Sequence, residues 1–212
     1  MLTMISHSKK FILISPPKTG SVTLSHFFIK YADYSEIIQQ EENNFEYLDI
    51  GVCDPDCKYQ QSKHNKLSAY TDVVDLNDYY KIGCIRNPYD RMISFWTWSC
   101  KVSWKNKIFY SWSFPRWLRI LKKRPWARQT YCDYFFVNNS MKMNDFIRIE
   151  HINEDLKRIC AKLDIQYKEP TITNNTKRKP GKNYLNKKSI KLINEIFSED
   201  FEQFNYQQIS VD

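Results

Sequence analysis

Apolar and polar residues follow one another along this chain in blocks that predict strands alternating with helices. Residues 10–15 contain a continuous apolar run, which is typical of a strand that is buried on both faces. A turn follows, and apolar residues then recur at helical spacing over residues 21–31, so a helix is expected to begin just after Gly20. A strand, a glycine-containing turn and a helix in this order present backbone N–H groups and a helix dipole to an anion.

The same alternation continues to the end of the chain. Residues 79–85 predict a second buried strand, and residues 87–99 begin with the asparagine, proline and aspartate of a typical helix start. A short strand is predicted over residues 145–149, and two further helices are predicted to begin at Asn153 and Asn186. The side chains that these two helices should bury are Leu156, Ile159, Cys160, Leu163, Ile190, Ile193, Ile196 and Phe197.

This order of elements predicts an α/β protein with three layers, in which helices flank a parallel sheet. The chain has 212 residues, of which 42% are hydrophobic, so it can bury one substantial core, and we expect a single domain over residues 1–212. Ligands of such sheets bind beyond the carboxyl ends of the strands. The turns that follow the first two predicted strands are therefore the places to look for function.

The formal net charge of +8 is concentrated in residues 91–132, which contain ten Lys and Arg and no Asp or Glu. All six tryptophans also lie in this segment, from Trp96 to Trp126. A basic, tryptophan-rich segment suits an anionic partner that offers flat faces, such as a sugar ring or a base. The alternative is a helical insertion that covers the surface and whose tryptophans are simply core, and the sequence leaves both interpretations open.

Neither a membrane segment nor a metal site is indicated. No apolar run reaches the roughly 18 residues that a membrane span needs, so we expect no membrane span, no signal peptide and a cytoplasmic protein. The six cysteines are scattered, and Cys53 and Cys57 have no second Cys/His pair at ligand spacing. We therefore predict reduced thiols and no bound metal.

The first segment that carries candidate chemistry is the turn PKTGSVT at residues 17–23. The backbone N–H groups of residues 19–23, the hydroxyls of Ser21 and Thr23 and the ammonium group of Lys18 can all converge on one phosphate. The turn is not a Walker A loop, because its lysine precedes the glycine. Taken alone, it is equally compatible with a purely structural turn.

The second segment is RNPYDRMISFW at residues 86–96. Arg86 ends the predicted strand and Ser94 lies about two turns into the following helix, so both can reach the same anion beyond the strand end. In the alternative interpretation, Arg86 pairs with Asp90 and Ser94 is a small packing residue.

Together, the two segments resemble the sulfotransferases that use 3'-phosphoadenosine 5'-phosphosulfate (PAPS). The similarity is greatest to the carbohydrate branch, which includes heparan sulfate 2-O-sulfotransferases and the bacterial enzymes of sulfotransferase family 2. That family pairs a loop PKTGSTS with a strand and helix RNPYDRxxSxY/W, and Val22 is the departure in the first segment. Weaker similarities continue at residues 146–156 and 200–206, where Asn205 replaces a glycine of the family.

This resemblance implies a P-loop-like fold, PAPS as co-substrate, no metal, and transfer of a sulfuryl group to a hydroxyl. It also implies roles for individual residues: Arg86 and Ser94 would hold the 3'-phosphate, and Lys18 would stabilise the charge that grows on the leaving phosphate. The 5'-phosphosulfate would be held by Lys18, Thr19, Gly20, Ser21, Val22 and Thr23.

The reaction needs a base for the proton of the acceptor hydroxyl, and histidine suits this role near neutral pH. His64 precedes the Arg86 segment by 22 residues, much as the catalytic histidine of related enzymes precedes theirs, so we predict that His64 is the base. Structural roles are expected for His26 and His151, and His7 lies in a lead that we expect to be flexible. Some sulfotransferases use a glutamate instead, which leaves three alternatives: Glu41, Glu42 and Glu46.

A basic loop at residues 177–182 stands just before the last predicted helix. Many sulfotransferases have a late loop of Lys or Arg with Gly that closes over the nucleotide. We therefore predict nucleotide contacts for Lys179 and Lys182, with Arg178 as a near neighbour, and a solvated run of charge is the alternative.

Two other functions remain as alternatives. A nucleotide kinase would share the fold plan, but the Walker lysine that it needs is absent. A nucleic-acid-binding protein without catalysis would explain the sequence pI of about 9.1 but not Lys18, Ser21, Arg86 and Ser94, so we do not expect a nucleic-acid partner.

The acceptor is predicted only as a class, an anionic glycan or another carbohydrate, from the resemblance and the basic segment. Animal enzymes of this branch are usually anchored in the Golgi membrane. A Golgi enzyme is expected here only if the chain is a shortened form.

Overall fold

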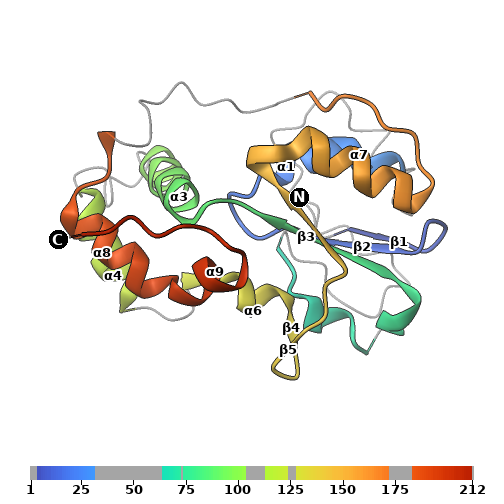
Figure 1. Cartoon of the computed structure of the whole chain (residues 1–212), viewed down its shortest axis with the longest axis horizontal. Helices are drawn as coiled ribbons and strands as arrows, with labels where there is room; N and C mark the ends of the chain where they lie inside the picture. Colours follow the sequence, from blue (N-terminus) through green and yellow to red (C-terminus); the bar gives the residue numbers. More distant parts are fainter. Residues whose placement is uncertain are drawn as a thin grey trace. The chain divides into compact units, whose positions relative to one another are not determined.

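The computed structural model describes residues 4–31, 64–72, 74–103, 113–123, 128–171 and 183–211 (Figure 1). The chain divides into two compact units, and each is described by itself. The first comprises Met1–Ile85 and Asp133–Asn175, and the second comprises Arg86–Cys132 and Thr176–Asp212. A single domain over residues 1–212 stays a prediction.

A four-stranded sheet in the order β1-β2-β3-β6 forms the centre of the first unit. Three of its strands, β2 (Phe11–Ile14), β3 (Tyr80–Ile85) and β6 (Asp145–Arg148), are parallel, so their carboxyl ends lie along one edge. All four residues of β2 are buried, as the continuous apolar run predicts. The predicted α/β class with a parallel sheet is therefore confirmed.

The fourth strand, β1 (Met4–Ser6), was not predicted from the sequence. β1 pairs antiparallel with β2, and Ser6 lies opposite Phe11 and is fully buried. Its hydroxyl accepts a hydrogen bond from the Lys9 N–H (3.2 Å), which satisfies the buried oxygen locally. His7, which was expected in a flexible lead, lies next to the strand and its Nδ1 is hydrogen-bonded to the Tyr79 hydroxyl at 2.5 Å.

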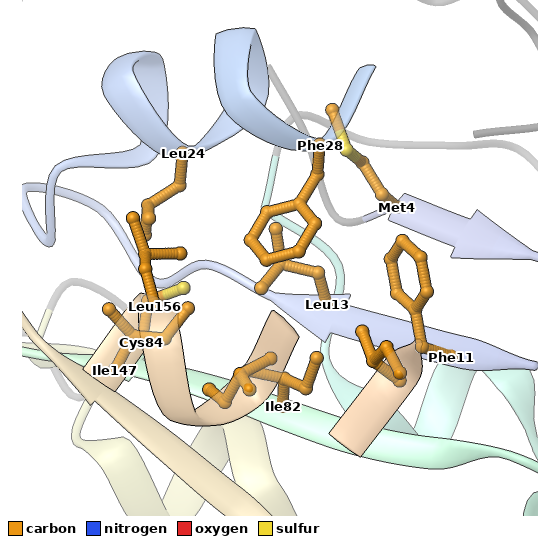
Figure 2. Close-up of a cluster of buried hydrophobic side chains, with 11 residues drawn as sticks. Met4, Phe11, Leu13, Leu24, Phe28, Ile82, Cys84, Ile147 and Leu156 are labelled. Carbon is orange, nitrogen blue, oxygen red and sulfur yellow. The ribbon is translucent and has the colours of Figure 1, made fainter. Parts of the chain in front are cut away.

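Two helices, α1 (Ser21–Phe28) and α7 (Ile152–Leu163), cover one face of this sheet (Figure 1). Figure 2 shows Leu24 and Phe28 of α1 meeting strand residues such as Leu13 and Ile82 in one apolar cluster. The predicted buried stripe of α7 is confirmed in full: Leu156, Ile159, Cys160 and Leu163. The 3-10 turn η1 (Ile29–Tyr31) continues α1 to the predicted end of the helix.

The opposite face of the sheet is packed against aromatic rings. A Cβ added to Gly83 of β3 would stand 2.7 Å from the ring of Phe146 and 3.1 Å from that of Phe135, so these rings pack directly on the glycine. Phe135 ends α6 (Tyr131–Phe135), and a hairpin follows, made of β4 (Phe136–Val137) and β5 (Ser140–Met141). Both residues of its turn have positive φ angles, the geometry of a type I′ turn.

The described part of the first unit also contains the 3-10 helices η4 (Leu67–Tyr70), η5 (Leu76–Asp78) and η6 (Ile149–His151). η6 follows β6 directly and leads into α7. It therefore places Ile149 at the carboxyl edge of the sheet.

The second unit is helical, with α3 (Pro88–Ser103), α4 (Phe114–Lys122), α8 (Lys187–Ile196) and α9 (Ser198–Gln203) around an apolar core. The predicted cap of α8 is confirmed, because Asn186 and Ser189 form a reciprocal capping box. The prediction of one last helix is wrong in one respect. The helix ends before Phe197, whose φ of −117° is not helical, and α9 begins after it.

The basic, tryptophan-rich segment is described only in part. Trp117 of α4 is 7% exposed within the apolar core of the second unit, whereas Trp98 of α3 is 47% exposed. Residues 104–112 and 124–127, with three of the tryptophans, lie outside the described residues. The insertion as a whole stays a prediction, and packing accounts for Trp117. Within the described ranges, no helix is both long enough and apolar enough to cross a bilayer.

Candidate functional site

The turn after β2 has an unusual backbone that suits an anion. Lys18 and Gly20 both have positive φ angles, 70° and 75°, whereas Thr19 between them does not. Alternation of left-handed and ordinary residues turns successive N–H groups toward one side and makes a concave anion site. The buried hydroxyl of Thr19 donates to the Pro16 carbonyl oxygen at 2.7 Å, which holds the turn closed. Thr19 therefore shapes the site with its side chain and offers a ligand only its backbone.

Gly20 is the N-cap of α1, so the first N–H groups of that helix belong to the residues of the predicted phosphate loop. Those groups have no partner within the helix and carry the positive end of its dipole. Ser21 and Val22 are partly exposed, whereas Thr23 is 6% exposed. A Cβ on Gly20 would come within 2.4 Å of the Ile149 Cδ1 atom. Glycine is thus favoured here by the backbone conformation, and any larger residue would also have to displace the end of the Ile149 side chain.

His64 lies at the same edge of the sheet. Its Nδ1 donates a hydrogen bond of 2.7 Å to the carbonyl oxygen of Ser15, the residue that follows β2. In the neutral ring this bond fixes the tautomer, with the proton on Nδ1 and the lone pair on Nε2. The contact brings the predicted base to the strand end from which the phosphate loop starts.

Ser15 joins His64 to the neighbouring strand. Its hydroxyl donates to the Sγ atom of Cys84 in β3 at 3.1 Å. Burial raises the pKa of the Cys84 thiol to about 12, although the hydrogen bond from Ser15 opposes this shift. The group is therefore a neutral thiol near pH 7 and acts here as an apolar neighbour, not as a nucleophile.

Arg86 follows the last residue of β3, and the second unit begins with it. The hydroxyl of Tyr131 hydrogen-bonds both backbone groups of this arginine: it accepts from the N–H at 2.8 Å and donates to the carbonyl oxygen at 2.7 Å. Ser94 lies in the second turn of α3 and is partly exposed. Both are where the sequence predicts them, one at a strand end and one on the following helix.

Behind Arg86 lies a buried ion pair that the sequence analysis did not identify. Arg91 and Asp200 are 2% and 0% exposed, and their nearest charged atoms are 3.7 Å apart. Arg91 also donates to the Gln129 carbonyl oxygen at 2.7 Å, and Asp200 accepts from the Tyr131 N–H at 2.8 Å. The two partners are 109 positions apart in the printed sequence, and no periodic pattern links such residues. Arg91 and Asp200 both lie in segments that resemble the family, but nothing in the sequence indicates that they pair.

The predicted residues therefore fall into three groups. The phosphate loop at residues 18–23 and His64 share the carboxyl edge of the sheet in the first unit, and Arg86 and Ser94 belong to the second. Their joint action on one ligand stays a prediction. The candidates outside the described residues are Glu41, Glu42, Glu46, Arg178, Lys179 and Lys182. Among the residues that the structure does describe, no three His, Cys, Asp or Glu side chains gather as metal ligands would.

Comparison with protein families gives a match over most of the chain. The family model with the description "Sulfotransferase family" matches residues 2–207, which is nearly the whole chain. Comparison with curated proteins and with solved structures gives no match.

Proposed function

Because the chain belongs to the sulfotransferase family, we propose that it transfers a sulfuryl group from PAPS to a hydroxyl of a carbohydrate acceptor. The observation that carries this proposal is the edge where β2 ends. There, a phosphate-type turn leads into the N-terminus of α1, and His64 is hydrogen-bonded to the first residue after the strand. The family match also covers both units, which supports our further proposal of a single sulfotransferase domain over residues 1–212.

Each end of PAPS has its own proposed site. The backbone N–H groups of residues 19–23, the Ser21 hydroxyl and the Lys18 ammonium group bind the 5'-phosphosulfate. Arg86 and Ser94 bind the 3'-phosphate, and Lys179 and Lys182 add contacts to the nucleotide. Fixing both ends aligns the sulfur with the attacking oxygen. The positive φ angles of Lys18 and Gly20 support this assignment, because such a backbone turns successive N–H groups toward one side.

His64 is the proposed base. Its Nε2 atom takes the proton of the acceptor hydroxyl while the oxygen forms a bond to sulfur. The bond from sulfur to the bridging oxygen breaks, and 3',5'-adenosine bisphosphate (PAP) leaves. Lys18 stabilises the charge that grows on the bridging oxygen. The bond from Nδ1 to Ser15 supports this role, because it holds the ring in the tautomer that can accept a proton.

The proposal is tested first by thermal unfolding with PAP, with ATP and magnesium as the comparison ligand. A ligand at a hundredfold excess over its dissociation constant stabilises the folded state by about 2.7 kcal/mol. For a chain of this size that corresponds to a rise in Tm of roughly 5 to 10 °C. We expect the rise with PAP and not with ATP, and we expect Arg86→Ala to abolish most of it.

A matched control is Arg119→Ala, which removes an exposed arginine from α4 in the same unit. It lowers the net charge as Arg86→Ala does, so it should keep the full rise with PAP. Transfer from radiolabelled PAPS to heparan sulfate, with a simple phenol as the second acceptor, then tests the acceptor class. Equal stabilisation by PAP and ATP would refute the proposed donor site, and transfer to the phenol alone would refute the carbohydrate acceptor.

A further inference from the structure

The backbone of Arg86 is fixed by a single hydroxyl group. The Tyr131 hydroxyl bonds both the N–H and the carbonyl oxygen of this residue, at 2.8 and 2.7 Å. Tyr131 is fully buried, so its hydroxyl would lack a solvent partner if these two bonds were lost. Arg86 follows the last residue of β3, so these two bonds hold the backbone just beyond the last residue of the strand.

The Tyr131 side chain is itself held on two sides. The guanidinium carbon of Arg91 stands 4.5 Å from the centre of its ring, and the ring of Phe204 meets it edge-on at 5.3 Å. Its backbone N–H donates to the Asp200 Oδ1 atom at 2.8 Å. The position of the hydroxyl is therefore determined by contacts from α3 and α9, on either side of α6 in sequence.

Arg91 and Asp200 serve this arrangement and are too deeply buried to meet a ligand. Their side chains are 2% and 0% exposed, and each compensates the charge of the other. Arg91 is further fixed by its hydrogen bond to the Gln129 carbonyl oxygen. The two arginines of the RNPYDR segment thus have different tasks, since Arg86 is partly exposed and Arg91 is not.

We propose that Tyr131 is a positioning residue for Arg86, and that the buried Arg91–Asp200 pair holds Tyr131 in place. This inference rests on the proposed function, in which Arg86 binds the 3'-phosphate of PAPS. The guanidinium group stands at the end of a long side chain, so a small rotation of the Arg86 backbone displaces it from a phosphate. The Tyr131 hydroxyl prevents that rotation.

The test is Tyr131→Phe, which keeps the ring and its contacts and removes only the hydroxyl. The dissociation constants of PAP and of 5'-AMP, which lacks the 3'-phosphate, are measured by calorimetry for the wild type and the variant. Two neutral hydrogen bonds correspond to a factor on the order of ten in an equilibrium constant. We expect PAP to bind about tenfold more weakly and 5'-AMP to bind as before, so that the preference for PAP falls by that factor.

A double mutant separates positioning from general destabilisation. If Tyr131 acts through Arg86, then Tyr131→Phe has no further effect on PAP binding once Arg86→Ala is present. The matched control is Tyr89→Phe, which removes another hydroxyl from the second unit. That hydroxyl also accepts a backbone N–H, from Ile209 at 2.8 Å, and bonds the Asn194 side chain. Tyr89→Phe should lower Tm to a similar degree and leave the preference for PAP over 5'-AMP intact.

The outcomes distinguish this inference from the function on which it rests. If Arg86→Ala leaves the preference for PAP unchanged, the proposed 3'-phosphate site is wrong and the inference falls with it. If Arg86→Ala abolishes the preference but Tyr131→Phe leaves it intact, only the positioning role is wrong. Should Tyr131→Phe not fold, Arg91→Lys replaces it, because it keeps the charge but loses the planar group that stacks on Tyr131. An unchanged preference in folded Arg91→Lys would likewise overturn the inference.

Discussion

Replacing Gly20 with alanine tests the geometry of the phosphate loop directly. The residue has a φ of 75° and a ψ of 20°, in the left-handed region, where a residue with a Cβ is less stable by about 1–2 kcal/mol. The new Cβ would also stand 2.4 Å from the Ile149 Cδ1 atom. That atom is the far end of a flexible side chain, so it can move aside at a cost of about 0.5–1.5 kcal/mol.

The two costs together predict that Gly20→Ala lowers the free energy of unfolding by about 1.5–3.5 kcal/mol. Equilibrium unfolding in urea, followed by circular dichroism, measures this difference. The part due to the clash is isolated with Ile149→Val, which removes Cδ1. In the double variant the loss should be smaller than the sum of the single losses by about 0.5–1.5 kcal/mol.

Gly83→Ala is the matched control for that cycle. It also adds a Cβ within 3 Å of a side chain, but the neighbour is the ring of Phe146 and the backbone angle is ordinary. Ile149→Val should therefore not rescue Gly83→Ala. The reasoning is refuted if Gly20→Ala costs less than about 0.5 kcal/mol, or if Ile149→Val relieves both glycine variants equally.

Two predictions concern histidines. His64→Ala should lower kcat by a factor of about 10² to 10⁴ with little change in PAP affinity. The control is His151→Ala, which replaces an exposed histidine of η6 and should leave kcat unchanged. A similar loss of kcat in both variants would contradict the assignment of the base. Burial lowers the pKa of His26 from its ordinary value of 6.5, so the unfolded chain takes up a proton there before the folded protein does. The stability present above pH 6.5 is therefore lost as the pH falls from 6.5 through the lowered folded-state pKa, with a slope of at most about 1.4 kcal/mol per pH unit. Urea unfolding at pH 7 and pH 5 should show a smaller decrease for His26→Gln than for the wild type, and equal decreases would count against the burial effect.

Elements with a strong local signal were predictable from the sequence. The apolar run of β2 and the cap at Asn186 are both signals contained within a few neighbouring residues. The structure has the strand and the helix start at these places. The start of α7 differs by one residue, because the helix is entered from the 3-10 turn η6 and begins at Ile152 rather than at Asn153. β1 has only three residues, one of them a buried serine, so no periodicity could mark it.

The candidate site was predictable where its residues are close in sequence. The loop at residues 18–23 and the segment from Arg86 to Ser94 were identified because each is a short motif on a predicted strand end. His64 was predicted because related sulfotransferases have a catalytic histidine at a similar distance before the second motif, and in the structure it is hydrogen-bonded to Ser15. Tyr131 and Asp200 could not be found this way, because their role depends on contacts between segments that only the folded chain brings together.

The contact between Gly20 and Ile149 has a consequence for the order of events during synthesis. The phosphate loop leaves the ribosome well before Ile149, the residue that packs against it, has been made. The parallel strands β2, β3 and β6 are likewise joined by long connections, and such pairings form late because closing a long loop is entropically costly. A nascent chain that ends after α3 therefore already carries both sequence motifs but lacks the packing that shapes the loop. We expect such a fragment to be unable to retain PAP, and to rely on chaperones until β6 and η6 have been made.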